Sequence, residues 1–132
     1  MKPKSSRTDV QKTLERMNSI LSAPAFDIEN NLQLIINSKD EENFFYSTKY
    51  TLADLEYDVE DVVEILKLLK VEDFSHTLLD KGKLDPPYML VFSKLIQSKE
   101  VYIKIKVRDL KEQVVCISFH YAKYPLSRPY AR

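Results

Sequence analysis

The residues best suited to chemistry are Tyr102, Lys104 and His120, which supply a phenol, an ammonium and an imidazole. They belong to two stretches, residues 101–108 and 113–121, in which apolar and polar residues alternate. Alternation of period two is typical of half-buried strands, so we expect two strands with these side chains on their polar face. An imidazole can transfer protons near neutral pH, and an ammonium can stabilise a charged phosphate. Such a face could bind and cleave a phosphodiester.

The register of the two strands follows from their apolar residues, which must face the same side of the sheet. The shortest loop that satisfies this condition is residues 110–112, with Asp109 opposite Gln113. Tyr102 then lies opposite His120, and directly opposed side chains have Cβ atoms about 4.5–5.5 Å apart. The phenol and the imidazole are therefore expected to be neighbours.

The same parity places Cys116 and Ser118 on the polar face, with Ser118 opposite Lys104. Cys116 could be a thiol nucleophile, although a small half-buried residue is the simpler interpretation. Ser118 with His120 but without a suited carboxylate makes a weak triad. Lys104 could equally belong to a solvated sheet face, and His120 could be a surface histidine at a strand end.

Outside these strands, His76 lies in the segment DFSHTLL and could be a catalytic or a solvated loop histidine. Two histidines without matching cysteine or carboxylate spacing give no metal-site pattern, so we expect no metal. Basic and aromatic residues interleave in the C-terminal tail, as in grooves that bind single-stranded nucleic acid. The candidate substrate-binding residues are Lys81, Lys83, Tyr121 and Arg128.

Composition limits the class of protein. The 132 residues are 44% hydrophobic and 30% charged, which suits one domain with a real core. The formal net charge is zero, so nucleic acid could bind only through a local patch. One cysteine, no apolar run of about 18 residues and no signal-peptide pattern indicate a cytoplasmic protein without a membrane span. One glycine argues against nucleotide-cofactor folds, and we expect no cofactor.

Helical periodicity dominates the first half of the chain and strand patterns the second, which predicts an α+β domain. We expect a disordered segment over residues 1–7 and a single domain over 8–132. Helices packed on a small antiparallel sheet are the expected architecture. The expected elements are helices over 8–22 and 27–38, a short strand over 43–46, a helical turn over 51–55, a helix over 58–70 capped by Asp58, and strands over 88–96, 101–108 and 113–121.

Several short strings, in order and spacing, resemble the motility quorum-sensing regulator (MqsR) toxin family. They are VEDVVEILKLL, VEDF, VYIKIKV and VVCISFH, and the resemblance covers residues 27–123. The family reads DFYKS where this chain has DFSHT, so His76 aligns with a catalytic lysine. Tyr102 matches the family's active-site tyrosine, and His120 replaces a second catalytic lysine. The family's catalytic glutamine corresponds to Met89, and the helix over 8–22 lies outside the resemblance.

The resemblance implies a RelE-like fold and a ribosome-independent mRNA endonuclease of a type II toxin–antitoxin pair, neutralised by a cognate antitoxin. On this interpretation His120 and His76 would exchange protons with single-stranded mRNA during attack by the 2′-hydroxyl, and Lys104 would stabilise the phosphate. Tyr102 would orient the phosphate or stack on a base. The alternative is a non-catalytic module that binds protein or nucleic acid through the same face.

Overall fold

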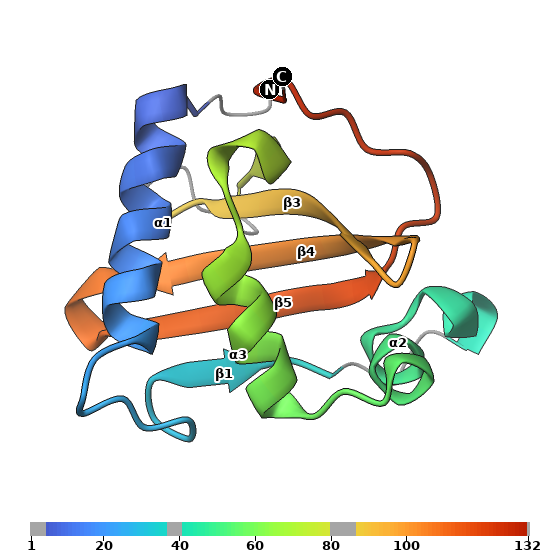
Figure 1. Cartoon of the computed structure of the whole chain (residues 1–132), viewed down its shortest axis with the longest axis horizontal. Helices are drawn as coiled ribbons and strands as arrows, with labels where there is room; N and C mark the ends of the chain where they lie inside the picture. Colours follow the sequence, from blue (N-terminus) through green and yellow to red (C-terminus); the bar gives the residue numbers. More distant parts are fainter. Residues whose placement is uncertain (1–4, 37–40, 80–86, 132) are drawn as a thin grey trace.

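The computed structural model describes residues 5–36, 41–79 and 87–131, without the side chains of 41–43. Over these residues the protein is α+β, with three α-helices and a five-stranded sheet (Figure 1). The elements are α1 (Arg7–Leu21), β1 (Leu32–Leu34), α2 (Thr48–Leu55), α3 (Val59–Leu68), β2 (Phe74–Leu78), β3 (Met89–Ile96), β4 (Lys99–Arg108) and β5 (Gln113–Tyr121), with short 3₁₀ helices η1 (Glu41–Tyr46), η2 (Val71–Asp73) and η3 (Asp109–Lys111).

The sheet has the strand order β1-β5-β4-β3-β2. Strands β3 to β5 form the expected antiparallel meander and β2 extends it by one strand, but β1 pairs with β5 in parallel. The sheet is therefore mixed, and the expectation of a wholly antiparallel sheet was wrong. Helices α2 and α3 also follow the first strand, so the helices are not gathered at the N-terminus.

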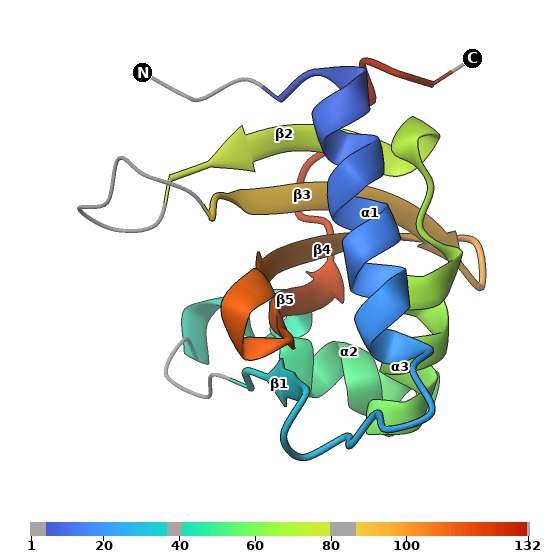
Figure 2. The same ribbon diagram turned by 90° about the vertical axis from the view of Figure 1, so that its left-hand side faces the viewer.

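Helices α1 and α3 cover one face of the sheet, as Figure 2 shows from the side. Their apolar faces pack on the inward residues of β3, β4 and β5 in one hydrophobic core. Burial of apolar surface at about 25 cal/mol per Å² is the main stabilising contribution of such a core. The largest fully buried side chains are Phe92, Phe119, Met17, Leu21, Leu66, Ile103 and Ile105.

Both long helices begin at capping boxes. Asp58 caps α3 as expected and accepts a hydrogen bond from the Asp61 backbone N–H. Helix α1 is capped by Ser6, whose hydroxyl accepts from the Asp9 N–H, and so begins at Arg7, before the predicted residue 8. Reciprocal bonds of this kind satisfy backbone N–H groups that have no partner within the helix.

The helix predicted over residues 27–38 does not form; a turn and β1 take its place over the described part. Asp27 accepts hydrogen bonds from the Glu29 backbone and the Asn30 side chain, and the Asn31 side chain accepts from the Asp27 N–H. Short polar side chains that bond to the local backbone compete with helix formation. The pairing of Leu32–Leu34 with β5 then favours a strand over the helix that the spacing of the apolar residues predicts.

Three further expectations were wrong because of local chemistry and pairing. Residues 43–46 belong to η1 rather than to a strand. The hydroxyl of Ser47 accepts from the Tyr50 N–H and begins α2 at Thr48, earlier than the predicted turn at 51–55. Residues 74–78, which we expected to be irregular, form β2 by pairing with β3 at the edge of the sheet.

The β3–β4 hairpin has a two-residue turn, Gln97 and Ser98, both with positive φ (52° and 69°). Such turns match the twist of the flanking strands. The predicted strands over 88–96 and 101–108 leave a four-residue turn over 97–100, which is two residues too long. Lys99 and Glu100 therefore belong to β4, and Glu100 enters the sheet.

Helix α2 covers the outer edge of β5 beyond the short β1. The Thr48 hydroxyl accepts a hydrogen bond from the Phe119 N–H (3.1 Å), and the Thr51 hydroxyl accepts from the Tyr121 N–H (2.9 Å). Both threonines are buried. The contacts satisfy backbone donors of an edge strand that would otherwise be open and hold the His120 end of β5 in place.

Candidate functional site

At the end of the β4–β5 hairpin that carries the candidate residues, the two strands pair in the predicted register. Tyr102 lies opposite His120, and Lys104 lies opposite Ser118. Nearer the loop the prediction was wrong, because Gln113 pairs with Arg108 and the loop has four residues, 109–112.

A β-bulge restores the register. Ile105 pairs with Cys116, so Ile117 is the extra residue between the two registers. The bulge also turns Cys116 to the other face. Its side chain is fully buried in the core, and burial raises the pKa of the thiol to about 12. The prediction that Cys116 shares the polar face was therefore wrong, and the thiol is not placed to act as a nucleophile.

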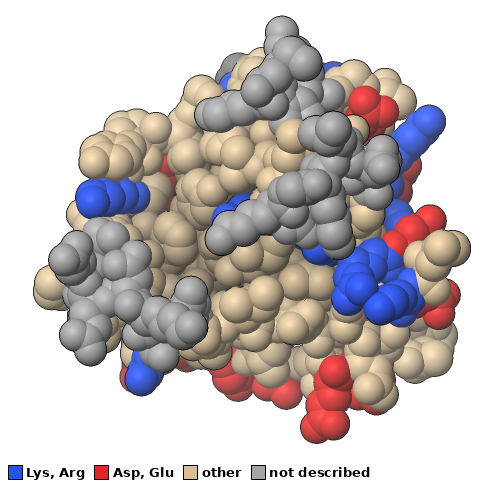
Figure 3. All heavy atoms as spheres, turned by 180° about the vertical axis from the view of Figure 1, so that it is seen from behind, with Lys and Arg blue, Asp and Glu red and all other residues tan. Residues whose placement is uncertain are grey.

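The polar residues lie on the face of the sheet that α1 and α3 do not cover. Tyr102, Lys104, Ser118 and His120 are half-buried there, around the buried Val91. In Figure 3, which looks onto this face, a few Lys and Arg atoms show near the middle, larger Lys and Arg groups lie toward the sides, and most Asp and Glu atoms lie along the rim. Among the described residues, this face therefore combines titratable side chains with local positive charge.

Tyr102 and His120 form the centre of this face. Their rings are stacked, with centroids 4.9 Å apart and planes at 7°. His120 Nδ1 lies 3.0 Å from the backbone carbonyl oxygen of Tyr121. Since a carbonyl can only accept, Nδ1 carries the proton, and the Nε2 of the neutral ring is the basic nitrogen.

The surroundings shift both groups in directions that suit a base and a neutral donor. Burial lowers the pKa of His120 below its usual value, and the charge of Lys104 lowers it further, against the opposing hydrogen bond to Tyr121. Burial raises the pKa of the Tyr102 phenol. At neutral pH His120 is therefore largely unprotonated and Tyr102 keeps its proton.

His76 reaches the same face, but from the far edge of the sheet. It is paired with Val91 on β3, and its Nδ1 lies 2.9 Å from the Ser75 hydroxyl. Three strand spacings separate β2 from β5, which is about 14 Å at about 4.8 Å each. The structure thus brings Tyr102 and Lys104 together with His120, while His76 stands apart.

A carboxylate that the sequence did not reveal lies beside this centre. Glu100 precedes Tyr102 by two residues on β4, and the hydroxyl of buried Ser93 donates to it. Ser93 itself pairs with Tyr102, and the Leu126 N–H of the C-terminal tail also donates to Glu100 (3.4 Å). Glu100 belongs to β4 because the hairpin turn has only two residues, 97–98. A prediction with a two-residue turn would have placed Glu100 in the strand.

Of the predicted substrate-binding residues, Tyr121 and Arg128 lie in the described part of the chain. Tyr121 points to the other face, where its hydroxyl donates to Asp54 and Lys99 lies 5.0 Å from its ring. Arg128 lies exposed in the tail. Lys81 and Lys83 lie outside the described residues.

Two surface hollows, of about 390 and 400 Å³, share Pro87 and Val107 near the loop end of β4. The candidate site lies instead at the other end of that strand, on the face opposite α1 and α3, where Tyr102 and His120 are half-buried. Within the described ranges, no group of three or more His, Cys, Asp or Glu side chains could hold a metal ion. None of the described helices is long and apolar enough to cross a membrane.

The fold and site together define an α+β protein with a histidine–tyrosine–lysine cluster on the sheet face opposite α1 and α3. No protein-family model, no curated protein and no solved structure matches the chain.

Proposed function

We propose that this protein is a metal-independent endoribonuclease that cleaves single-stranded RNA by attack of the ribose 2′-hydroxyl. The observation that carries the proposal is the stack of His120 on Tyr102, with Nδ1 held by a backbone carbonyl and the Lys104 charge nearby. This arrangement supplies a neutral base, a neutral donor and a cation on one face of the sheet, where their side chains are half-buried.

The first step is proton removal by His120. Its Nε2 takes the proton of the 2′-hydroxyl, the 2′-oxygen forms a bond to phosphorus, and the bond from phosphorus to the 5′-oxygen breaks. The lowered pKa of His120 keeps the ring neutral and ready to accept this proton at neutral pH. Lys104 stabilises the negative charge on the phosphate oxygens.

The departing 5′-oxygen needs a proton from a nearby donor. We assign this role to the Tyr102 hydroxyl, which its raised pKa keeps protonated and whose ring lies against His120. His76 is about 14 Å across the sheet by strand spacing, too far to act on the same phosphate. The products are a 2′,3′-cyclic phosphate and a 5′-hydroxyl, and the proton on His120 returns to solvent or to Tyr102.

The test is cleavage of a mixed-sequence single-stranded RNA by purified protein in EDTA, with the new ends mapped. We expect 5′-hydroxyl ends, and His120→Ala should lose about 10²–10⁴-fold in rate. His76→Ala is the matched control and should keep most of the activity. Cleavage by His120→Ala at the parental rate would overturn the assignment, and intact RNA with every variant would favour the non-catalytic binding module.

The resemblance in motif order also supports a finer proposal, a RelE-like toxin of the cytoplasm that a cognate antitoxin neutralises. Expression of the parent should then arrest growth, and His120→Ala should relieve the arrest. Co-purification from the native source, with the bound protein identified, would test for the antitoxin.

A further inference from the structure

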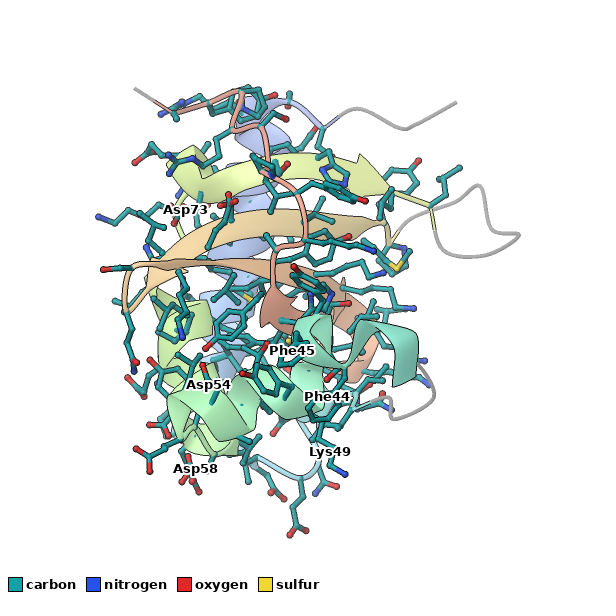
Figure 4. All side chains as sticks on the ribbon, turned by 90° about the vertical axis from the view of Figure 1, so that its right-hand side faces the viewer. Phe44, Phe45, Lys49, Asp54, Asp58 and Asp73 are labelled. Atoms are coloured by element: carbon teal, nitrogen blue, oxygen red, sulfur yellow. The ribbon has the colours of Figure 1, made fainter. Side chains whose placement is uncertain are left out.

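Four aromatic residues, Phe44, Phe45, Tyr46 and Tyr50, form a cluster at the edge of the sheet, where η1 meets α2. We call it the aromatic platform. Phe44 is 51% exposed and Phe45 is 63% exposed, which is unusual for phenylalanine. Both rings meet the Tyr50 ring edge to face, at 5.2 and 5.1 Å between centroids. The contacts among Phe44, Phe45 and Tyr50 thus hold the platform in place while the two phenylalanines, labelled in Figure 4, remain largely exposed.

Cations border the platform. Lys123 Nζ lies 6.0 Å from the Tyr46 ring centroid and 5.8 Å from that of Tyr124, which is itself 71% exposed. Lys49 is exposed beside Tyr50 at the start of α2. Exposed aromatic rings next to lysines are the two components of surfaces that bind single-stranded nucleic acid: bases stack on the rings and phosphates bind the cations.

The platform is continuous with the candidate site. Lys123 follows His120 by three residues, which span at most about 11 Å of chain, and its ammonium reaches the Tyr46 ring. Figure 2 shows η1 on the side of the sheet away from α1 and α3, which is the side that carries His120. A strand of RNA with one phosphate at His120 would therefore pass over the platform.

We infer that the aromatic platform is a base-binding subsite, on which one or two unpaired bases beside the scissile phosphate stack while Lys49 and Lys123 contact the adjoining phosphates. The inference rests on the proposed ribonuclease function for its choice of ligand. It restricts the substrate to RNA that is unpaired at this point, because bases in a duplex already stack on one another. It also explains how a chain of zero net charge holds RNA: stacking supplies affinity that does not depend on a basic surface.

The decisive experiment separates binding from cleavage. The ligand is a mixed-sequence single-stranded oligonucleotide of about eight nucleotides whose riboses all lack the 2′-hydroxyl, so that it can bind but not react. Phe45→Ala in the full chain should weaken binding by about 5- to 150-fold, from the 1–3 kcal/mol of a base–aromatic stack. Leu110→Ala, which removes a fully exposed apolar side chain at η3, is the matched control and should bind like the parent.

A tryptophan variant provides a direct readout. The chain has no tryptophan, so Phe45→Trp introduces a single indole at the platform. It should bind at least as tightly as the parent, and the oligonucleotide should quench its fluorescence, whereas a duplex of the same sequence should not. Equal binding by Phe45→Ala and Leu110→Ala, an unchanged indole signal at saturation, or no binding by the parent would each overturn the subsite.

The two proposals fail separately. If the platform binds the oligonucleotide but His120→Ala cleaves RNA as fast as the parent, the catalytic assignment is lost and the subsite stands. If His120→Ala is inactive and Phe45→Ala neither binds nor cleaves differently from Leu110→Ala, the ribonuclease stands and the subsite is lost.

Discussion

His120 owes its chemical character to three neighbours rather than to its position in the sequence. The Tyr102 ring covers one side of the imidazole, the Tyr121 carbonyl fixes the tautomer, and the Lys104 charge disfavours a second proton. Desolvation and a nearby like charge both stabilise the neutral ring. A histidine held neutral with a defined basic nitrogen is a base that works without a metal.

The first prediction concerns pH. If the neutral His120 ring is the base, as proposed, kcat/KM should rise with pH through the His120 pKa and level off above it, with the midpoint below the usual 6.5. Lys104→Met should move this midpoint upward by removing the like charge. Lys106→Met, two residues along β4, is the control and should leave the midpoint in place. A parental midpoint above 6.5 would contradict the assignment of His120.

Parity of alternating residues was enough to predict that Tyr102 lies opposite His120. The prediction survived two errors that cancel: the loop is one residue longer than expected, and the bulge at Ile117 adds one residue to β5. Neither could be predicted, because Val115 and Cys116 both suit a buried position and the alternation does not choose between them. The burial of Cys116 and the position of Glu100 both depend on such single-residue choices.

At the level of elements, α2 links the fold to the site. It has only eight residues, which is too short to be stable alone, and its place depends on the bonds from β5 to Thr48 and Thr51. The same helix presents Lys49 and Tyr50 to the platform. One docking contact therefore positions both the His120 end of β5 and the aromatic residues.

The second prediction tests this docking. Thr51→Val keeps the shape of the side chain but leaves the buried Tyr121 N–H without its acceptor, which should cost about 1–3 kcal/mol of unfolding free energy. Thr13→Val is the control, because the exposed Thr13 hydroxyl bonds only to a carbonyl within α1 and should change stability by less than about 0.5 kcal/mol. Urea unfolding measures both. Equal stability of the two variants would show that α2 does not depend on this bond.

Elements with strong local signals were predictable, and elements defined by pairing were not. The N-cap at Asp58 and the stripe of Val62, Val63 and Leu66 identify α3 from sequence alone. In contrast, the three residues of β1 show no strand pattern in the sequence. They are extended because they pair with the edge of β5. Strand pairing of this kind is tertiary and overrides local propensity.

At the scale of the whole molecule, the two faces of the sheet carry different kinds of side chain. The face under α1 and α3 contains the core, while the other carries His120, Tyr102 and Lys104. The C-terminal tail contacts β2 and the N-terminal segment. The Tyr130 ring stacks on Phe74 with centroids 5.7 Å apart, and the Tyr130 hydroxyl donates to the Ser5 carbonyl.

The third prediction uses Cys116 to report on the stability of the whole molecule. This single thiol is fully buried, its pKa is raised to about 12, and its strand is paired with β4 on one side and β1 on the other. Reaction with a thiol reagent therefore requires the molecule to open, and at equilibrium its rate should follow the population of the open form. The folded protein should react far more slowly than the chain unfolded in urea.

Thr51→Val then tests whether the docking of α2 affects the stability of the whole molecule. If opening at Cys116 is global, this variant should react about 5- to 150-fold faster than the parent, the factor that corresponds to a loss of 1–3 kcal/mol. Thr13→Val should react at nearly the parental rate. If both variants react equally, the β1–β5 edge opens by itself, and the core under α1 and α3 is stable independently of α2.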